Sequence, residues 1–290
     1  MRVPKNLHEA LLLLNHPLDH SGEEWTPFAG GTDLMVSLDA GLVPKKSYVS
    51  LWGIPELRGI QIEVEHMILG ALTTYSEIRS NVSLQSEFPN LVQAAKETGA
   101  IGIQNRGTLG GNIANASPAA DSPPALLVYD AELELLSSEG ARWIDYAHFH
   151  TGYKKTQRRK NEIISRIRLP RKTSQGQRIH TYRKVGTRKA QAISKVCLAG
   201  VIQIENHRIR GVRIAFGSVA PIPLRCIQTE QVLLEQRLSP GIIQEAQEQL
   251  AREITPLSDI RSTSEYRMQV AQNLLKEFLN LVSTSHVELD

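Results

Sequence analysis

The segment from Gly99 to Pro124 constrains the fold more than any other part of the chain, because it has few large side chains. It is dense in Gly, Asn, Ser, Ala and Pro. Such a segment rarely forms a packed core by itself, and long structureless loops are uncommon inside compact domains. We therefore expect residues 99–124 to be either a disordered loop or a loop whose backbone is ordered by a ligand.

Two pairs of adjacent glycines, Gly30-Gly31 and Gly110-Gly111, could bind such a ligand. Adjacent glycines let the main chain approach a bulky anion, and successive N–H groups before a helix form a positive concavity for phosphate. One diphosphate needs several donors, which two such turns can supply from opposite sides. Without a ligand, the first pair is a strand-to-helix turn capped by Thr32 or Asp33, and the second is a plain connection.

The order of the expected elements predicts an α+β fold. Strand-like and helix-like segments alternate in the first part of the chain, where Thr74 and Glu77 form a capping box. Farther on, residues 196–204 and 208–216 read as strands joined by a turn at 205–207, and helices follow between 229 and 282. Strands followed by helices are typical of this class. The sequence has no GxGxxG motif, so a Rossmann fold lacks its best signal.

Composition limits the classes of function. A chain of 290 residues suits two or three subdomains. Its two cysteines, Cys197 and Cys226, lack metal-ligand spacing, so we expect buried free thiols. An iron–sulfur cluster needs about four thiolates, which this chain cannot supply by itself. We see neither a signal segment nor an apolar run of about 20 residues, which predicts a cytoplasmic chain without a membrane span.

Charged and metal-binding residues give no strong signal. The net charge is +3, and we expect the densest basic run, residues 154–160, to be a solvated loop and not a nucleic-acid surface. His148 and His150 would share one face of a strand, but the sequence suggests no third ligand nearby. We assign neither a metal site nor a catalytic residue.

The two glycine-rich stretches resemble those of the flavin subunits of molybdenum hydroxylases. This family includes xanthine dehydrogenase, carbon monoxide dehydrogenase and 4-hydroxybenzoyl-CoA reductase. The more specific stretch is Thr-x-Gly-Gly-Asn-Ile-x-x-Ala-Ser-Pro-x-x-Asp, which runs from Thr108 to Asp121. Other segments also look like this family, in its order, so the resemblance covers nearly the whole chain. These segments are residues 70–74, 182–186, 188–190, 259–261 and 266–267.

The resemblance implies a fold and a division into domains. Residues 1–176 would form an FAD-binding domain of the vanillyl-alcohol-oxidase (PCMH) type. This domain would have two subdomains, about 1–55 and 56–176, with the cofactor between them. Residues 177–290 would form a C-terminal α+β domain, a sheet with packed helices that covers the flavin edge.

The resemblance also implies FAD contacts, residue by residue. Asp121 stands where the family has an acidic FAD contact, Ile164 matches a backbone contact near the flavin, and Lys184 matches a basic residue beside the isoalloxazine ring. A cation there would stabilise the negative charge of reduced flavin. Without the resemblance, Lys184 reads as a surface lysine and Asp121 as a helix N-cap. The first diphosphate loop would be Pro27, Phe28, Ala29, Gly30, Gly31, Thr32, Asp33 and Leu34, and the second Thr108, Leu109, Gly110, Gly111 and Asn112.

The implied activity is electron transfer within a larger enzyme, with a purine such as xanthine as the first candidate substrate. A large subunit would hold molybdopterin, and a small subunit would pass electrons from [2Fe–2S] clusters through FAD to NAD+ or another acceptor. The assembly would be a dimer of heterotrimers. Two alternatives remain open: a stand-alone FAD-dependent oxidoreductase of the same fold, and a scaffold protein that has lost FAD.

Overall fold

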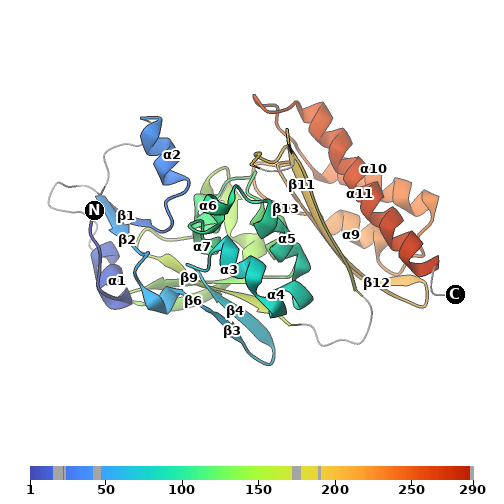
Figure 1. The fold of residues 1–290 in the computed structure, drawn as a ribbon. Coiled ribbons are helices and arrows are strands. Elements are labelled where there is room, and N and C mark those ends of the chain that lie inside the picture. The colour runs from blue at the N-terminus through green and yellow to red at the C-terminus, as the bar shows by residue number, and fades with distance from the viewer. Residues whose placement is uncertain (16–21, 23, 42–46, 172–177, 189–190, 288–290) are drawn as a thin grey trace.

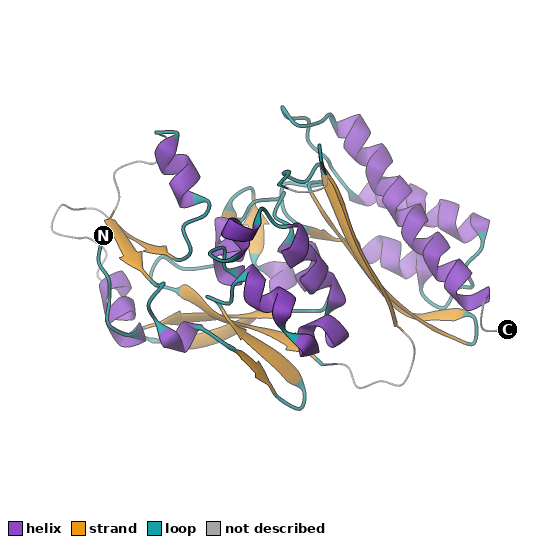
Figure 2. Ribbon diagram, in the orientation of Figure 1, coloured by secondary structure: helices purple, strands orange, loops and turns teal. Residues whose placement is uncertain are grey.

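The computed structural model describes residues 1–290 apart from 16–21, 23, 42–46, 172–177, 189–190 and 288–290. The N-terminal part mixes strands with a run of helices, and the C-terminal part is a sheet with a helical layer (Figures 1 and 2). The α+β class expected from the sequence is therefore confirmed. Both residues of the expected domain boundary at 176/177 lie outside the described residues, and so do Lys189 and Ala190.

A small N-terminal unit carries the first glycine pair. Strands β1 (Trp25–Phe28) and β2 (Ser47–Ser50) pair in parallel, and helix α1 (Leu7–Asn15) packs beside them. The apolar side of α1 reaches the small core behind β2, which fixes the position of these strands. Helix α2 (Leu34–Asp39) follows the glycine pair and buries none of its side chains.

A five-stranded antiparallel sheet forms the base of the N-terminal part, with the strand order β3-β4-β9-β5-β6. Alternate side chains of its central strands point into one core because successive residues of a strand face opposite sides. Its strands are β3 (Ile60–Ile62), β4 (His66–Gly70), β5 (Glu132–Ser137), β6 (Gly140–Asp145) and β9 (Ile163–Pro170). Shorter elements connect them: η1 (Pro55–Leu57), η2 (Tyr146–His148), β7 (His150–Gly152) and β8 (Lys155–Thr156).

Helices α3 to α8 lie between this sheet and the C-terminal sheet (Figure 1). The capping box expected at Thr74 is present: its hydroxyl accepts from the Glu77 amide, and Glu77 bonds back to the Thr74 amide. The helices are α3 (Tyr75–Ser80), α4 (Val82–Glu87), α5 (Pro89–Glu97), α6 (Ile101–Gln104), α7 (Leu109–Asn115) and α8 (Ser122–Val128).

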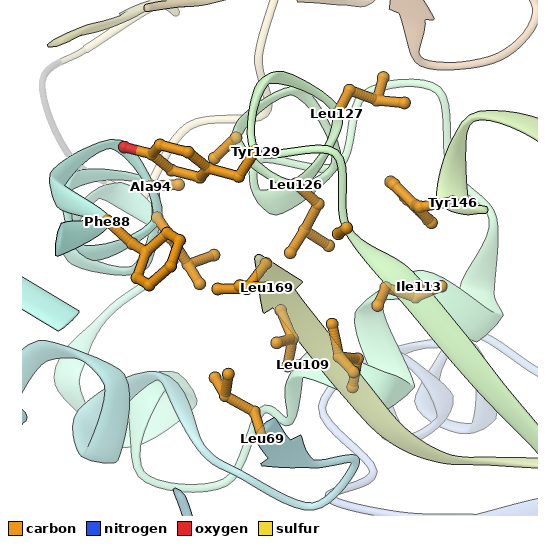
Figure 3. Close-up of a cluster of buried hydrophobic side chains, with 14 of the residues drawn as sticks. Leu69, Phe88, Ala94, Leu109, Ile113, Leu126, Leu127, Tyr129, Tyr146 and Leu169 are labelled. Atoms are coloured by element: carbon orange, nitrogen blue, oxygen red, sulfur yellow. The ribbon is translucent and has the colours of Figure 1, made fainter. Parts of the chain in front are cut away.

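Of the two alternatives for residues 99–124, the disordered loop is wrong, because this segment contains α6 and α7 and leads into α8. Leu109 and Ile113 lie fully buried in the main core, beside Leu126 and Leu169 (Figure 3). Small residues allow this close packing: a Cβ on Gly110 would lie 2.6 Å from the Cβ of Ala71. Leu109, Gly110 and Ile113 are thus enough to pack this segment into the core without a run of large side chains.

The C-terminal part is a four-stranded sheet in the order β10-β11-β12-β13, with α9, α10 and α11 on its outer face (Figure 1). Its inner face, including Tyr182, Cys197 and Ala215, completes the main core against α5 and α8. The elements are β10 (Arg178–Val185), β11 (Val196–Glu205), β12 (Arg208–Gly217), β13 (Leu224–Arg225), α9 (Ile227–Leu233), α10 (Pro240–Glu253) and α11 (Ser264–Val287).

Several local predictions for the C-terminal part are confirmed. β11 and β12 form a hairpin whose turn residues Asn206 and His207 both have positive φ, as a tight hairpin turn requires. Cys197 and Cys226 are free and buried. Among the helices in the described part of the chain, none combines the length and apolar character needed to cross a membrane.

Candidate functional site

Both glycine pairs line one cleft of about 1170 Å³, which also meets loops of the C-terminal part. This volume slightly exceeds the range of about 300–1,000 Å³ that is usual for pockets that hold a drug-sized ligand. Every site residue expected from the resemblance lines the cleft except Leu109 and Lys184. The side chain of Leu109 belongs to the core, and Lys184 lies behind Asp121.

The first glycine turn is open for binding. Gly31 has a φ of +81°, which disfavours any residue with a Cβ. Asp33 occupies the N-cap position of α2, one of the two residues expected there, but its side chain makes no cap bond. Among the described residues, none accepts a hydrogen bond from the amides of residues 29–33. This turn therefore offers the cleft a series of N–H donors that the described residues leave unused.

The second glycine turn differs in its chemistry, because its amides are already bonded within the protein. The Gly110 amide donates to the Ala71 carbonyl, and the Gly111 amide donates to the Thr108 hydroxyl. Gripping by main-chain amides, expected for both turns, is thus available only at the first. Gly111 contributes space instead: a Cβ there would lie 2.8 Å from Thr108 Oγ1 and would face Ala29 across 3.8 Å.

The two turns converge because the chain segments that carry them touch. A Cβ on Gly30 would lie only 1.7 Å from the carbonyl oxygen of Arg106, so no other residue fits there. The Arg106 guanidinium lies 3.9 Å from the ring centroid of Trp52, and Arg58 lies 4.5 Å from the same ring. Trp52 thus joins the second turn to the loop that follows β2.

Asp121 is the buried acid of the cleft, with 8% of its surface exposed. Its Oδ2 accepts from Lys184 Nζ at 2.7 Å, and its Oδ1 has no hydrogen-bond partner among the described residues. Burial raises the pKa of Asp121 to about 6, although Lys184 opposes this shift. Asp121 stands at the N-cap position of α8, as the alternative interpretation expects, but its side chain makes no cap bond.

Lys184 is not the surface lysine of the alternative interpretation. Its side chain is 6% exposed and donates to Asp121 and to the carbonyl oxygen of Glu97 at 3.0 Å. The cation therefore lies in a second layer behind Asp121 and acts on the cleft through that carboxylate.

The basic run was expected to be a solvated loop, but Lys154 and Arg158 line the cleft. Arg158 Nη1 donates to the carbonyl oxygens of Arg159, Lys160 and Glu162, the last at 2.6 Å. Arg158 thus shapes this loop from inside and adds positive charge to the rim. The expectation of a solvated loop is therefore corrected for Arg158, whereas Lys154 is exposed.

The histidines do not form a metal site in the described residues, where no group of three potential ligands occurs. His150 is buried, and its Nε2 lies 2.9 Å from the Tyr146 hydroxyl. Burial lowers the pKa of His150 to about 4. His148 lies in η2, outside β7, so the two side chains do not share a strand face.

Sequence reasoning gave no role to the C-terminal residues that line the cleft. Ser194, Ser218, Asp259 and Arg267 all belong to its wall. The segments 259–261 and 266–267 carried part of the family resemblance, which was the only signal for them. Nothing in their local pattern predicts that they meet in one wall.

The comparisons with known proteins agree with this architecture. Residues 1–172 match the family described as the FAD binding domain in molybdopterin dehydrogenase, and residues 180–282 match the CO dehydrogenase flavoprotein C-terminal domain. The xanthine dehydrogenase FAD-binding subunit of Escherichia coli O157:H7 is 30% identical over 253 residues. That alignment covers 87% of this chain and 86% of that protein.

Two further relatives extend the comparison. The glyceraldehyde dehydrogenase medium chain of Sulfolobus acidocaldarius is 29% identical over 271 residues, which are 93% of each chain. A solved structure of carbon monoxide dehydrogenase from Hydrogenophaga pseudoflava, which lacks the Mo-pyranopterin moiety of the molybdenum cofactor, superposes with a TM-score of 0.90. The identity is 28%, and the alignment covers 96% of this chain and 95% of that chain.

These matches span both parts of the chain and confirm the family that the glycine-rich stretches indicated. They also confirm an FAD-binding domain followed by a C-terminal α+β domain. This chain belongs to the FAD-binding subunits of the molybdenum hydroxylase family.

Proposed function

We propose that the cleft holds one FAD, with its diphosphate at the first glycine turn. The single observation that carries this proposal is the convergence of both turns on one cleft of dinucleotide size. The residues fit the cofactor: the amides of 29–33 are available donors, and Gly31 and Gly111 leave space that a Cβ would fill. Asp121 Oδ1 is a buried acceptor that still lacks a donor among the described residues.

Bound FAD supplies both one-electron and two-electron chemistry, which suits a subunit that receives electrons singly and delivers them in pairs. The chain itself binds, orients and shields the cofactor. Asp121 would contact FAD directly, and Lys184 would hold that carboxylate in place. Ile164, on the cleft wall, would contact the cofactor through its backbone.

We further propose that the chain is the electron-relay subunit of a xanthine or purine dehydrogenase. A large molybdopterin subunit would oxidise the substrate, a small [2Fe–2S] subunit would deliver the electrons, and NAD+ would accept them. The similarity to a xanthine dehydrogenase FAD-binding subunit supports the purine as substrate. Other relatives belong to a glyceraldehyde dehydrogenase and a carbon monoxide dehydrogenase. The identity of the substrate is therefore tested first.

The experiment starts with the complex purified from its native host through a tag on this chain. We expect two co-purifying chains, flavin absorbance, and NAD+ reduction that depends on added xanthine or hypoxanthine. A dimer of heterotrimers predicts two copies of each chain by native mass spectrometry. Turnover by this chain alone would support the stand-alone oxidoreductase, and a colourless chain that ignores added FAD would overturn the flavin site.

A further inference from the structure

Arg267 is almost completely buried, with 4% of its surface exposed, although it carries a charge. Charged side chains are rarely buried unless they are paired or hydrogen-bonded. Its Nη1 donates to the carbonyl oxygens of Lys195 at 2.5 Å and Ser218 at 3.3 Å. Its Nη2 donates to Asp259 Oδ1 at 2.7 Å. One guanidinium at the start of α11 therefore joins three segments that are distant in sequence.

Each of these segments, residues 191–195, 218–220 and 257–261, forms part of the cleft wall on the C-terminal side. The first two segments are also bonded to each other. The Ser218 hydroxyl donates to the Ser194 carbonyl at 3.1 Å. Asp259 Oδ1 also accepts from the amides of Arg261 and Ser262, so its loop closes around the same carboxylate that binds Arg267.

Two of these segments contain strained backbone. Ser218 has a φ of +65° and Gln191 a φ of +53°, which is the left-handed region that residues other than glycine rarely adopt. Such conformations persist only where the surrounding structure holds them, and they concentrate at functional sites. The Ser218 amide also donates to the Pro118 carbonyl at 2.8 Å, three residues before Asp121. The wall is thus tied to the side of the cleft that carries the buried acid.

We propose that Arg267 is a positioning residue that holds these three segments as a single wall over bound FAD. The proposal rests on the proposed flavin site, since the wall acts on the ligand that the glycine turns hold. It assigns separate tasks to the two parts of the chain. The N-terminal part provides affinity for FAD, and the wall held by Arg267 shields the cofactor from solvent.

Hydrogen exchange on the full chain without FAD tests the wall itself. Loss of a buried charge-assisted hydrogen bond should speed exchange about tenfold or more in all three segments of Arg267→Met. The segments 28–34 and 106–113 should keep wild-type rates. The matched control is Arg261→Met, because Arg261 also pairs with Asp259 but is 41% exposed. This control should affect only residues 257–263.

Faster exchange confined to residues 257–263 in Arg267→Met would contradict the proposal that Arg267 holds the three segments together. Equal loosening of the glycine turns would also overturn it, since it would indicate general destabilisation. If Arg267→Met does not fold, Arg267→Lys replaces it. A lysine keeps the charge but lacks the planar fork that reaches several acceptors. We expect intermediate exchange rates in the same three segments, and wild-type rates there would refute the proposal.

Iodide quenching of flavin fluorescence on the FAD-loaded chain tests the shielding. Arg267→Met should retain FAD yet show a severalfold higher quenching constant, whereas Arg252→Met, an exposed arginine of α10 that does not line the cleft, should resemble the wild type. An unchanged quenching constant would refute the shielding role. If the wild-type chain fails to hold FAD, the proposed function falls, but the exchange data still decide whether Arg267 joins the three segments.

Discussion

At the scale of single residues, the two central glycines of the second turn have different tasks. We predict that Gly111→Val yields a folded chain that lacks FAD. A branched side chain at Gly111 would project toward Thr108 and Ala29, two residues that line the cleft. The measurement is the ratio of flavin absorbance to protein absorbance after purification, together with a circular dichroism spectrum to verify folding.

Two other glycines provide controls for that experiment. Gly102 lies in the same stretch with open space around it, so Gly102→Ala should keep full flavin. Gly110→Ala should instead lower the melting temperature, because the added Cβ meets the backbone of Ala71 at 2.8 Å. Full flavin content in Gly111→Val would show that the second turn is not part of the binding site.

Asp121 predicts a dependence of stability on pH. Burial raises its pKa from 3.8 in the unfolded chain to about 6, so folding favours the protonated form. The stability from this group is present at low pH and is lost as the pH rises from about 4 to about 6. The full change is about 3 kcal/mol in the free energy of unfolding.

The test compares the wild type without FAD with Asp121→Asn by urea unfolding across this pH range. The difference between their unfolding free energies should change with pH between about 4 and 6, because only the wild type has a titratable group at position 121. Parallel curves would mean that Asp121 titrates normally. The variant also leaves Lys184 without its acid, which lowers its stability at every pH above this range.

At the scale of elements, the loop after β2 should control how firmly the two glycine turns meet. Trp52 stacks on Arg106, whose carbonyl oxygen occupies the space next to Gly30. Removal of an exposed cation–π contact costs about 0.5–1 kcal/mol, so Trp52→Leu should weaken FAD binding about two- to fivefold. Titration of the FAD-free chain with FAD measures the dissociation constant.

Arg58→Met is the matched control for Trp52, because Arg58 stacks on the same ring but belongs to neither glycine turn. It should leave FAD affinity close to that of the wild type. Equal weakening by both substitutions would indicate that the whole loop, and not the contact with Arg106, sets the affinity.

Elements with a strong local code could be predicted from the sequence. The capping box at Thr74, the hairpin turn at Asn206-His207 and the glycine pair after β1 each have a signature within a few residues. Helix α7 could not be predicted in this way. Its first turn contains two glycines, and its place depends on Ala71 and Leu169, which lie far away in sequence.

At the scale of the whole molecule, helices α3 to α8 place the cleft by packing between two sheets (Figure 1). The same packing brings Lys184 against Asp121, and Ser218 against Pro118. These pairs are 63 and 100 residues apart, and no local periodicity encodes them. The family resemblance indicated Asp121 and Lys184 as cofactor residues. The resemblance did not indicate that Lys184 binds the Asp121 carboxylate. Nor did it indicate that Arg267 holds together the C-terminal wall of the cleft.

The contact between the two parts can be tested at Tyr129, which follows α8. Its hydroxyl accepts from the Asn90 amide at 3.0 Å and lies 3.0 Å from His180 Nδ1 on β10. Asn90 Nδ2 in turn donates to the carbonyl oxygen of Gly200 on β11. Tyr129→Phe leaves the buried Asn90 amide without its acceptor, which costs about 1–3 kcal/mol of unfolding free energy.

The hydrogen bonds of Tyr129 and Asn90 link α5 to the C-terminal sheet. Their loss in Tyr129→Phe should therefore reduce the cooperativity of unfolding as well as the urea concentration at the unfolding midpoint. Urea unfolding followed separately by tryptophan fluorescence and by far-ultraviolet circular dichroism should give coincident curves for the wild type. All three tryptophans lie in the N-terminal part. Separated curves for Tyr129→Phe would indicate that the two parts then unfold one after the other. Coincident curves with an unchanged midpoint would contradict a structural role for this contact.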